Sequence, residues 1–329
     1  LDNRINLTFD WYKRNNFDLI GIVTTQGIGG EVRKYGNSAT MESNGYEISL
    51  STKNIEKKNF TWTTDIIFSH TKNLITKLET TKRGIDFVTG TGFGREGYDY
   101  RSIFSYQFKG LNEDGIPILV NELGQLTSNA AGTELNTINF QDRENFDHLV
   151  YRGPADPTDF GSLGNTFKVY GFRLNVFLTY SFGNVVRLDP VFSSSYSDLD
   201  AMPREFANRW MVPGDEQYTT VPAIVSKRQM QNYTSSYLSR IYNAYNYSTE
   251  RIAKGDFIRL KEVSVSYDIP KKVISKAKLQ SLSLKLQATN LALLYCDKKL
   301  NGQDPEFFNT GGVASPVPRQ FTLTIRLGL

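Results

Sequence analysis

The stretch FRLNVFLTYSF, residues Phe172–Phe182, shows the most regular alternation of side chains in the sequence. Every second residue is large and apolar, whereas the positions between them include Arg173 and Asn175. Successive side chains of a β-strand point to opposite faces. The stretch is therefore predicted to form a strand with one apolar and one mainly polar face.

Seven further segments alternate in the same way and are also predicted to be strands. They are Ile5–Tyr12, Tyr46–Ser51, Phe60–Ser69, Leu163–Val169, Phe257–Tyr267, Leu282–Thr289 and Phe321–Leu329. In the fifth of these the alternation loses phase near Lys261 and Glu262, and a β-bulge there would restore it.

The connections between these strands are alternately short and long. The short ones are residues 54–59, 170–171 and 270–280, and the long ones are roughly 14–40, 74–160, 187–256 and 291–319. A soluble β-sandwich has no reason to gather its long loops at one end, whereas outer-membrane barrels have tight periplasmic turns and long extracellular loops. Aromatic residues such as Trp11 and Phe60 near the strand ends agree with interfacial girdles. We therefore expect an all-β fold, an antiparallel transmembrane β-barrel segment with long extracellular loops.

The composition argues against several other classes of protein. The chain has 38 Lys and Arg against 34 Asp and Glu, scattered along its length, so it has no basic footprint for nucleic acid. Its single cysteine, Cys296, excludes an internal disulfide, and only His70 and His148 could add to a zinc or haem site. No apolar run reaches the length of a membrane-spanning helix. No metal and no cofactor are expected.

Two groups of residues are candidates for function within the barrel interpretation. Inward-facing charged residues would contact a plug or line a water-filled passage, or they would merely satisfy one another; they are Asp10, Asp65, Arg173, Lys285 and Arg326. Loop aromatics could contact a ligand or a partner, or could equally pack loop against loop; they are Trp210, Tyr233, Tyr237 and Tyr242. A short helix is expected at Pro203–Trp210.

No catalytic constellation can be identified. His148 follows Asp147, but nothing brings a nucleophile, a base and an orienting group together. The acidic stretches Asn112–Gly115 and Asp297–Glu306 could bind a hard cation, but neither has the spacing of a calcium loop. We expect both to be solvated turns, and we expect the chain not to be an enzyme.

Several segments, taken in order, resemble the C-terminal half of SusC/RagA-type TonB-dependent outer-membrane transporters. They are LDNRINLTFDWYKRNNFDLI, MESNGYEISL, FTWTTDIIFSHTKN, YQFKGLNEDGIPI, YRGPADPTDFG, NTFKVYGFRLNVFLTYSFGN, RWMVPGDE, DFIRLKEVSVSYDIP, LQATNL, DPE and the final strand. Each segment alone is a weak signal, but their number, order and span over nearly the whole chain make the resemblance specific.

The resemblance implies a role and a set of partners. Residues 1–329 would form about eight strands of a 22-stranded barrel, its C-terminal portion, without the plug domain and the N-terminal strands. The first residues already read as a strand, so we expect Leu1 to be a cut within a longer polypeptide. The whole protein would import an oligosaccharide or a peptide across the bacterial outer membrane with a SusD-like lipoprotein. It would contact the TonB complex through the missing N-terminal part, and lipid and lipopolysaccharide through its barrel wall, but not nucleic acid.

Two alternatives remain open on the sequence. The first is a self-contained eight-stranded outer-membrane barrel acting as an adhesin or surface-binding protein. The second is a secreted soluble β enzyme. Any barrel would be excluded if Leu174, Val176, Leu178, Leu323 and Ile325 packed inside a two-sheet core.

Overall fold

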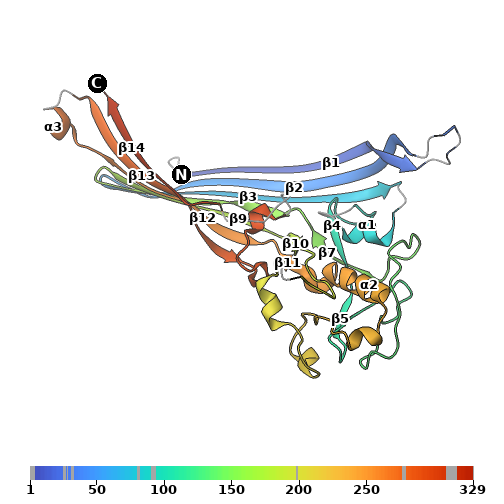
Figure 1. Ribbon diagram of the computed structural model, residues 1–329. Helices are drawn as coiled ribbons and strands as arrows, with labels where there is room; N and C mark the ends of the chain where they lie inside the picture. The colour runs from blue at the N-terminus through green and yellow to red at the C-terminus, as the bar shows by residue number, and fades with distance from the viewer. Residues whose placement is uncertain are drawn as a thin grey trace.

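Eight antiparallel strands form one large twisted sheet in the computed structural model (Figure 1). The structure describes residues 4–24, 27, 29–30, 33–79, 82–89, 94–197, 199–275, 279–308 and 317–328, so Leu1 and Leu329 lie outside it. In sheet order the strands are β1 (Ile5–Thr24), β2 (Arg33–Lys57), β3 (Phe60–Leu78), β8 (Asp159–Val169), β9 (Phe172–Phe182), β12 (Phe257–Asp268), β13 (Ser281–Cys296) and β14 (Gln320–Gly328). Each strand pairs with its predecessor and successor in the chain, apart from the small loop strands between them, as a meandering barrel wall requires.

All eight predicted strands are present, and so is the predicted bulge. The register of β12 shifts between Leu260 and Glu262 against both of its neighbours. Against β9 the extra residue is Lys261, whereas against β13 the extra residue lies on β13, between Thr289 and Ala292. The shift lets Arg259 and Glu262 face the same side of the sheet, as the pairs Arg259–Thr179 and Glu262–Phe177 show.

The apolar face of the sheet is exposed, and no second sheet covers it within the described residues. Leu323 is 66% exposed, Ile325 58% and Leu174 36%. This arrangement excludes a two-sheet core and confirms the barrel-type fold. A strand of the length of β9, tilted by about 40°, spans about 25 Å, the height of the apolar band of an outer-membrane barrel.

Aromatic side chains lie on this outward face near both ends of the band. At the end with the short turns, Phe172 stacks on Tyr267 with ring centroids 4.2 Å apart, and Trp62 stacks on Phe167. At the other end, Tyr46 stacks on His70 with centroids 5.1 Å apart. The positions agree with the predicted interfacial girdles.

The first long connection is not a loop, which corrects the expectation for residues 14–40. β1 and β2 continue their pairing from Arg14–Ser43 to Thr24–Arg33, and β3 extends to Leu78 (Figure 1). The alternation weakens here because bulges interrupt the register between Asn16 and Ile20. These strand ends therefore project beyond the apolar band.

The other long connections fold into a compact group of elements at the same end of the sheet, which we call the cap (Figure 1). Its helices are α1 (Gly84–Val88), η1 (Arg204–Asn208), η2 (Asp215–Gln217), η3 (Gln229–Gln231), α2 (Ser235–Asn246), η4 (Thr249–Arg251), η6 (Lys298–Leu300) and η7 (Pro305–Phe307). Its strands are β4 (Ser102–Tyr106), β5 (Phe108–Leu111), β6 (Pro117–Leu119), β7 (Leu149–Pro154), β10 (Val185–Arg187) and β11 (Ile252–Lys254). η1 confirms the short helix expected near residues 203–210, whereas α2 was not predicted.

Tight connections close the opposite end of the sheet. Tyr170 and Gly171, with φ of 44° and 86°, make the two-residue turn between β8 and β9. Between β12 and β13 lies the short helix α3 (Lys271–Ile274). Within the described residues, no helix is sufficiently long and apolar to cross a membrane.

Candidate functional site

The inward face of the sheet carries all five charged residues that were predicted to face the lumen. The registers place Arg173 beside Ser266, Ser266 beside Lys285, and Ser283 beside Arg326, all on the face opposite Leu174 and Leu323. Asp10 and Asp65 lie on the same face, on β1 and β3. The alternation of each strand sufficed to predict the facing, but not the distances between these residues.

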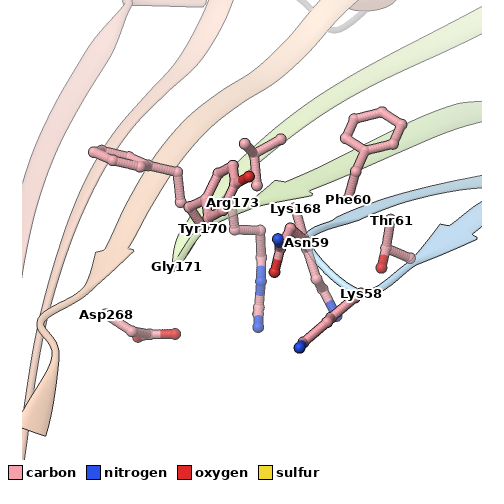
Figure 2. Close-up of a pocket in the computed structure, with 11 residues that line it drawn as sticks. Lys58, Asn59, Phe60, Thr61, Lys168, Tyr170, Gly171, Arg173 and Asp268 are labelled. Carbon is pink, nitrogen blue, oxygen red and sulfur yellow. The ribbon is translucent and has the colours of Figure 1, made fainter.

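Three of these five charged residues line one hollow, and the other two charged residues do not. Arg173, Lys285 and Arg326 line a hollow of about 530 Å³ on the inward face near the short turns. A neighbouring hollow of about 310 Å³ shares Arg173 with it (Figure 2). Asp10 and Asp65 line neither of these hollows.

The β-bulge supplies the carboxylate that contacts this group. Glu262 lies 3.6 Å from Nζ of Lys285, and its Oε2 accepts a hydrogen bond of 2.9 Å from Gln287. Without the extra residue Lys261, Glu262 would face the apolar side. The bulge therefore places this ion pair in the lumen.

A buried ion pair fastens the last long loop to the inward face. Arg259 Nη2 on β12 lies 2.5 Å from Asp304 Oδ1, and Arg259 Nε lies 3.0 Å from Glu306. The side chains of Arg259 and Asp304 are only 3% and 1% exposed. The expectation that Asp297–Glu306 is a solvated turn was therefore wrong for Asp304, because the partner arginine is far away in sequence.

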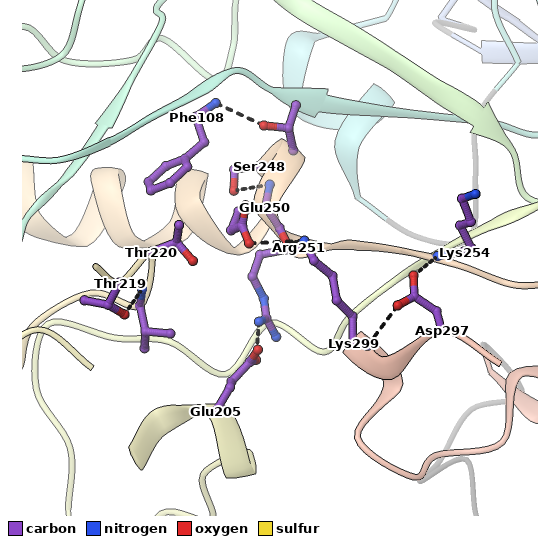
Figure 3. Close-up of polar contacts among 12 residues, drawn as sticks. Phe108, Glu205, Thr219, Thr220, Ser248, Glu250, Arg251, Lys254, Asp297 and Lys299 are labelled. Carbon is purple, nitrogen blue, oxygen red and sulfur yellow. Dashed lines mark hydrogen bonds and ion pairs between the residues drawn. The ribbon is translucent and has the colours of Figure 1, made fainter. Parts of the chain in front are cut away.

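Further ion pairs stabilise the third long loop and join it to the fourth (Figure 3). Within the third loop the buried Arg251 pairs with Glu205, and between the two loops Lys299 Nζ lies 3.1 Å from Glu250. The backbone N–H of Lys254 donates to Asp297 at 2.8 Å. Among the described residues, no group of three His, Cys, Asp or Glu side chains could hold a metal ion.

The predicted loop tyrosines lie in the core of the cap. Tyr233, Tyr237 and Tyr242 are all buried, and α2 carries the last two against α1, β4 and β6. The Tyr237 hydroxyl donates to Thr127 O at 2.7 Å, and burial raises the pKa of Tyr237 to about 12. In this structure the rings pack loop against loop, and ligand contact by these three residues stays a prediction.

The Asn112–Gly115 turn is held by one of these tyrosines. The Tyr233 hydroxyl donates to Asp114 Oδ2 at 2.9 Å and accepts from Asn112 Nδ2 at 3.0 Å. Asn112 is buried, so the expectation of a solvated turn was wrong for this residue as well. The turn is a packing element of the cap.

Trp210 is also buried, but it lies beside an exposed apolar surface. Its ring packs against Leu111 and Ala223, and its Nε1 donates to Glu216 at 3.0 Å. Met211 and Ile224 next to it are exposed and line a hollow of about 320 Å³ together with Trp210. The sequence analysis selected Trp210 as a candidate contact residue but did not select Met211. An apolar residue in a loop that contains Gly and Pro is a signal in the sequence that could have identified Met211.

These features define a class of protein: a wall of a β-barrel with one exposed apolar side, one polar side and a folded cap at one end. No protein-family profile matches the chain. The TonB-dependent receptor P3 of Formosa agariphila is 27% identical over 93% of this chain and 29% of its own length. The TonB-dependent receptor P39 of the same organism is 24% identical over 95% of this chain and 32% of its own length.

Solved structures show the same fold. The RagAB peptide transporter matches 99% of this chain and 34% of its own chain, with a TM-score of 0.70 and 20% identity. The RagAB peptide importer in its closed-closed state matches equally well, with a TM-score of 0.71 and 19% identity. The chain thus spans about a third of the length of the proteins it matches.

The resemblance to SusC/RagA-type TonB-dependent transporters is confirmed by these matches. The relatives are receptors and transporters rather than enzymes. They are outer-membrane proteins of bacteria, and the exposed apolar face of this chain agrees with that location.

Proposed function

We propose that this chain is the C-terminal wall of an importer that carries a nutrient across the outer membrane in a TonB-dependent way. The observation that carries the proposal is the open sheet with one apolar face, one polar face and a cap at one end. β1 and β14 are its edges, and neither has a second neighbour within the described residues. Unpaired edges are costly in a membrane, so further strands would complete the barrel.

The remaining parts of the importer follow from the same proposal. A plug domain and N-terminal strands would be supplied by the rest of the polypeptide, and TonB would act through that part. The cargo would be an oligosaccharide or a peptide, captured together with a SusD-like lipoprotein on the cap. The match to the RagAB peptide transporter supports the peptide class. Lipid and lipopolysaccharide would cover the outward face.

The self-contained barrel is the second candidate, and the sheet geometry disfavours it. Closure would require β1 to pair with β14, whereas the two are opposite edges of an open sheet. The inward positions near the short turns are small, such as Ser264, Ser266 and Ser283, and an eight-stranded barrel fills its lumen with side chains. These small residues would leave the lumen of an eight-stranded barrel unfilled.

The test is uptake by cells of the source organism. The gene for the whole polypeptide is deleted, and growth is measured on defined oligosaccharide mixtures and on peptide mixtures. The proposal expects growth on one class of nutrient to be lost, to return with the wild-type gene, and to be lost equally when TonB is removed. Unchanged growth on every mixture, or growth that depends on this gene but not on TonB, would contradict it.

A further inference from the structure

Three arginine side chains are buried in the described part of the chain, and one of them has no carboxylate partner. Arg251 pairs with Glu205, and Arg259 pairs with Asp304. Arg187 on β10 is only 7% exposed, and within the described residues it forms no ion pair with a carboxylate. A buried charge without a counter-charge is costly, so Arg187 requires an explanation that the other two arginines do not.

The guanidinium of Arg187 uses only part of its hydrogen-bonding capacity. Its Nη2 donates to the backbone oxygen of Phe104 and to Oγ of Ser105, both on β4. The ring of Tyr247 lies against the guanidinium, whose carbon is 5.4 Å from the ring centroid. Nε and Nη1 are buried and have no hydrogen-bond acceptor among the described residues. The side chain therefore presents a positive charge and buried N–H donors toward a place that these residues do not fill with an acceptor.

The charge of Arg187 persists in spite of its burial. Burial lowers the pKa of Arg187 to about 10, and Tyr247 and Tyr106 oppose this shift only in part. A guanidinium with this pKa is still protonated at neutral pH. An anion beside it would therefore relieve both the missing counter-charge and the missing acceptors.

From these observations we propose that Arg187 binds a chloride ion inside the cap. Nε and Nη1 of Arg187 donate to the ion, and the hydroxyl of Ser105, which is fully buried beside the guanidinium, can donate as well. A halide fits this set of groups because it accepts hydrogen bonds and donates none. The inference concerns only the cap, and it does not depend on the proposed function.

The enclosure of Arg187 favours a monatomic ion over a carboxylate of another segment. β10 contacts β4 and β7, and Tyr247 covers the guanidinium. A polypeptide segment could reach Nε and Nη1 only by breaking this packing, whereas a single ion occupies little room. Because the enclosed site exists only in the folded cap, chloride should stabilise the cap by mass action.

The first experiment measures this stabilisation in the full polypeptide. Amide hydrogen exchange of β4 and β10 is compared in sodium chloride and in sodium gluconate at equal ionic strength. We expect exchange to be about tenfold slower when the chloride concentration is about nine times Kd, and to follow a saturation curve. Bromide should act like chloride. Equal exchange in chloride and in gluconate would overturn the inference.

The second experiment removes the charge. Arg187→Met replaces the guanidinium by an apolar side chain, and we expect exchange of β4 and β10 in this variant to be the same in chloride and in gluconate. Arg240→Met is the matched control, because Arg240 is an exposed arginine on α2 in the same cap. This control should keep the tenfold effect of chloride. A chloride effect that persists in Arg187→Met, or that is lost in Arg240→Met, would contradict the proposed site.

The third experiment locates the ion in the wild-type protein, so it decides the question even if Arg187→Met fails to fold. Crystals of the full polypeptide are grown in sodium bromide, and anomalous diffraction is recorded at the bromine absorption edge. We expect a bromide peak within hydrogen-bonding distance of Nε or Nη1 of Arg187. Bromide peaks on the surface only, or a water molecule or a carboxylate of another segment at this place, would show that the inference is wrong.

Discussion

Arg259 and Asp304 form the most deeply buried ion pair among the described residues. Removing one partner of such a pair leaves the other charge uncompensated, which is far more costly than losing the pair as a whole. Asp304 lies in the last long loop and Arg259 lies on β12. Breaking the pair would therefore weaken the packing of that loop against the sheet.

We predict that Asp304→Asn frees this loop. The free energy of opening residues 298–308 should fall by about 3 kcal/mol, since Glu306 remains as a partial partner of Arg259. Hydrogen–deuterium exchange of that segment measures the change. Lys261→Ala removes only a long, half-exposed contact of 3.9 Å to Glu306, and it should change the opening by less than about 1 kcal/mol. Equal effects of the two substitutions would show that burial is not the cause.

We predict that the stability of the cap depends on pH through His148. Burial, opposed by the charges of Glu122, Asp142 and Asp147, lowers the pKa of His148 below its ordinary value of 6.5. The neutral form is therefore favoured in the folded cap, and the unfolded cap takes up the proton first as the pH falls. Stability is highest above pH 6.5 and is lost below it.

The measurement is urea unfolding of the cap, followed by fluorescence of Trp210, at pH 7.5 and pH 5. We expect the free energy of unfolding of the cap to decrease at pH 5 by up to about 1.4 kcal/mol per pH unit below the unfolded pKa. His148→Phe should weaken this pH dependence. If the unfolding free energy of the cap changed with pH in the same way in that variant, other groups would cause the pH dependence.

The two faces of each strand in the sheet lie in different environments, and β14 shows this difference most clearly. Leu323 faces outward and is exposed, whereas Thr322, which pairs with Gln287, lies on the polar face. We predict that Leu323→Arg destabilises the folded barrel by about 2–4 kcal/mol in a bilayer, because a charge on the lipid face lies in hydrocarbon. Thr322→Arg should change stability by less than about 1 kcal/mol, because Thr322 lies on the polar face and lines neither hollow. Guanidinium unfolding of the full polypeptide in phospholipid vesicles compares the two, and an equal loss would mean that the faces are misassigned.

The sequence predicted these strands well because their period-two pattern is local and the membrane demands it on every strand. It predicted the bulge at Lys261 for the same reason, since one extra residue visibly breaks the pattern. It did not predict the cap. α2 buries tyrosines whose hydroxyl partners, such as Thr127 O, are about a hundred residues away, so no local pattern marks them as core.

The charged site residues show the same limit. The facing of Arg173, Lys285 and Arg326 was predictable from alternation, but their meeting in one hollow depends on the registers of four strands. The burial of Asp304 depends on an arginine that pairs with it across a loop. The facing of a side chain could be predicted from the local sequence. Which side chains meet in space could not be predicted, because that depends on the register of strands and loops far apart in the sequence.

The whole molecule is an open sheet that is apolar outside and polar inside, with a cap over one end (Figure 1). Because unpaired edges are costly in a membrane, the proposed function requires partner strands for β1 and β14. The hollow of about 530 Å³ lies on the polar face, at the end opposite the cap. We propose that the import pathway runs from the cap to the short turns.

A cryo-EM structure of the native polypeptide, purified from the outer membrane of the source organism, tests this arrangement most directly. We predict that β1 and β14 each pair with further strands of the same polypeptide. We also predict that a folded plug from the same polypeptide fills the lumen. A closed barrel in which β1 pairs with β14, or a protein found in the soluble fraction, would contradict the proposal.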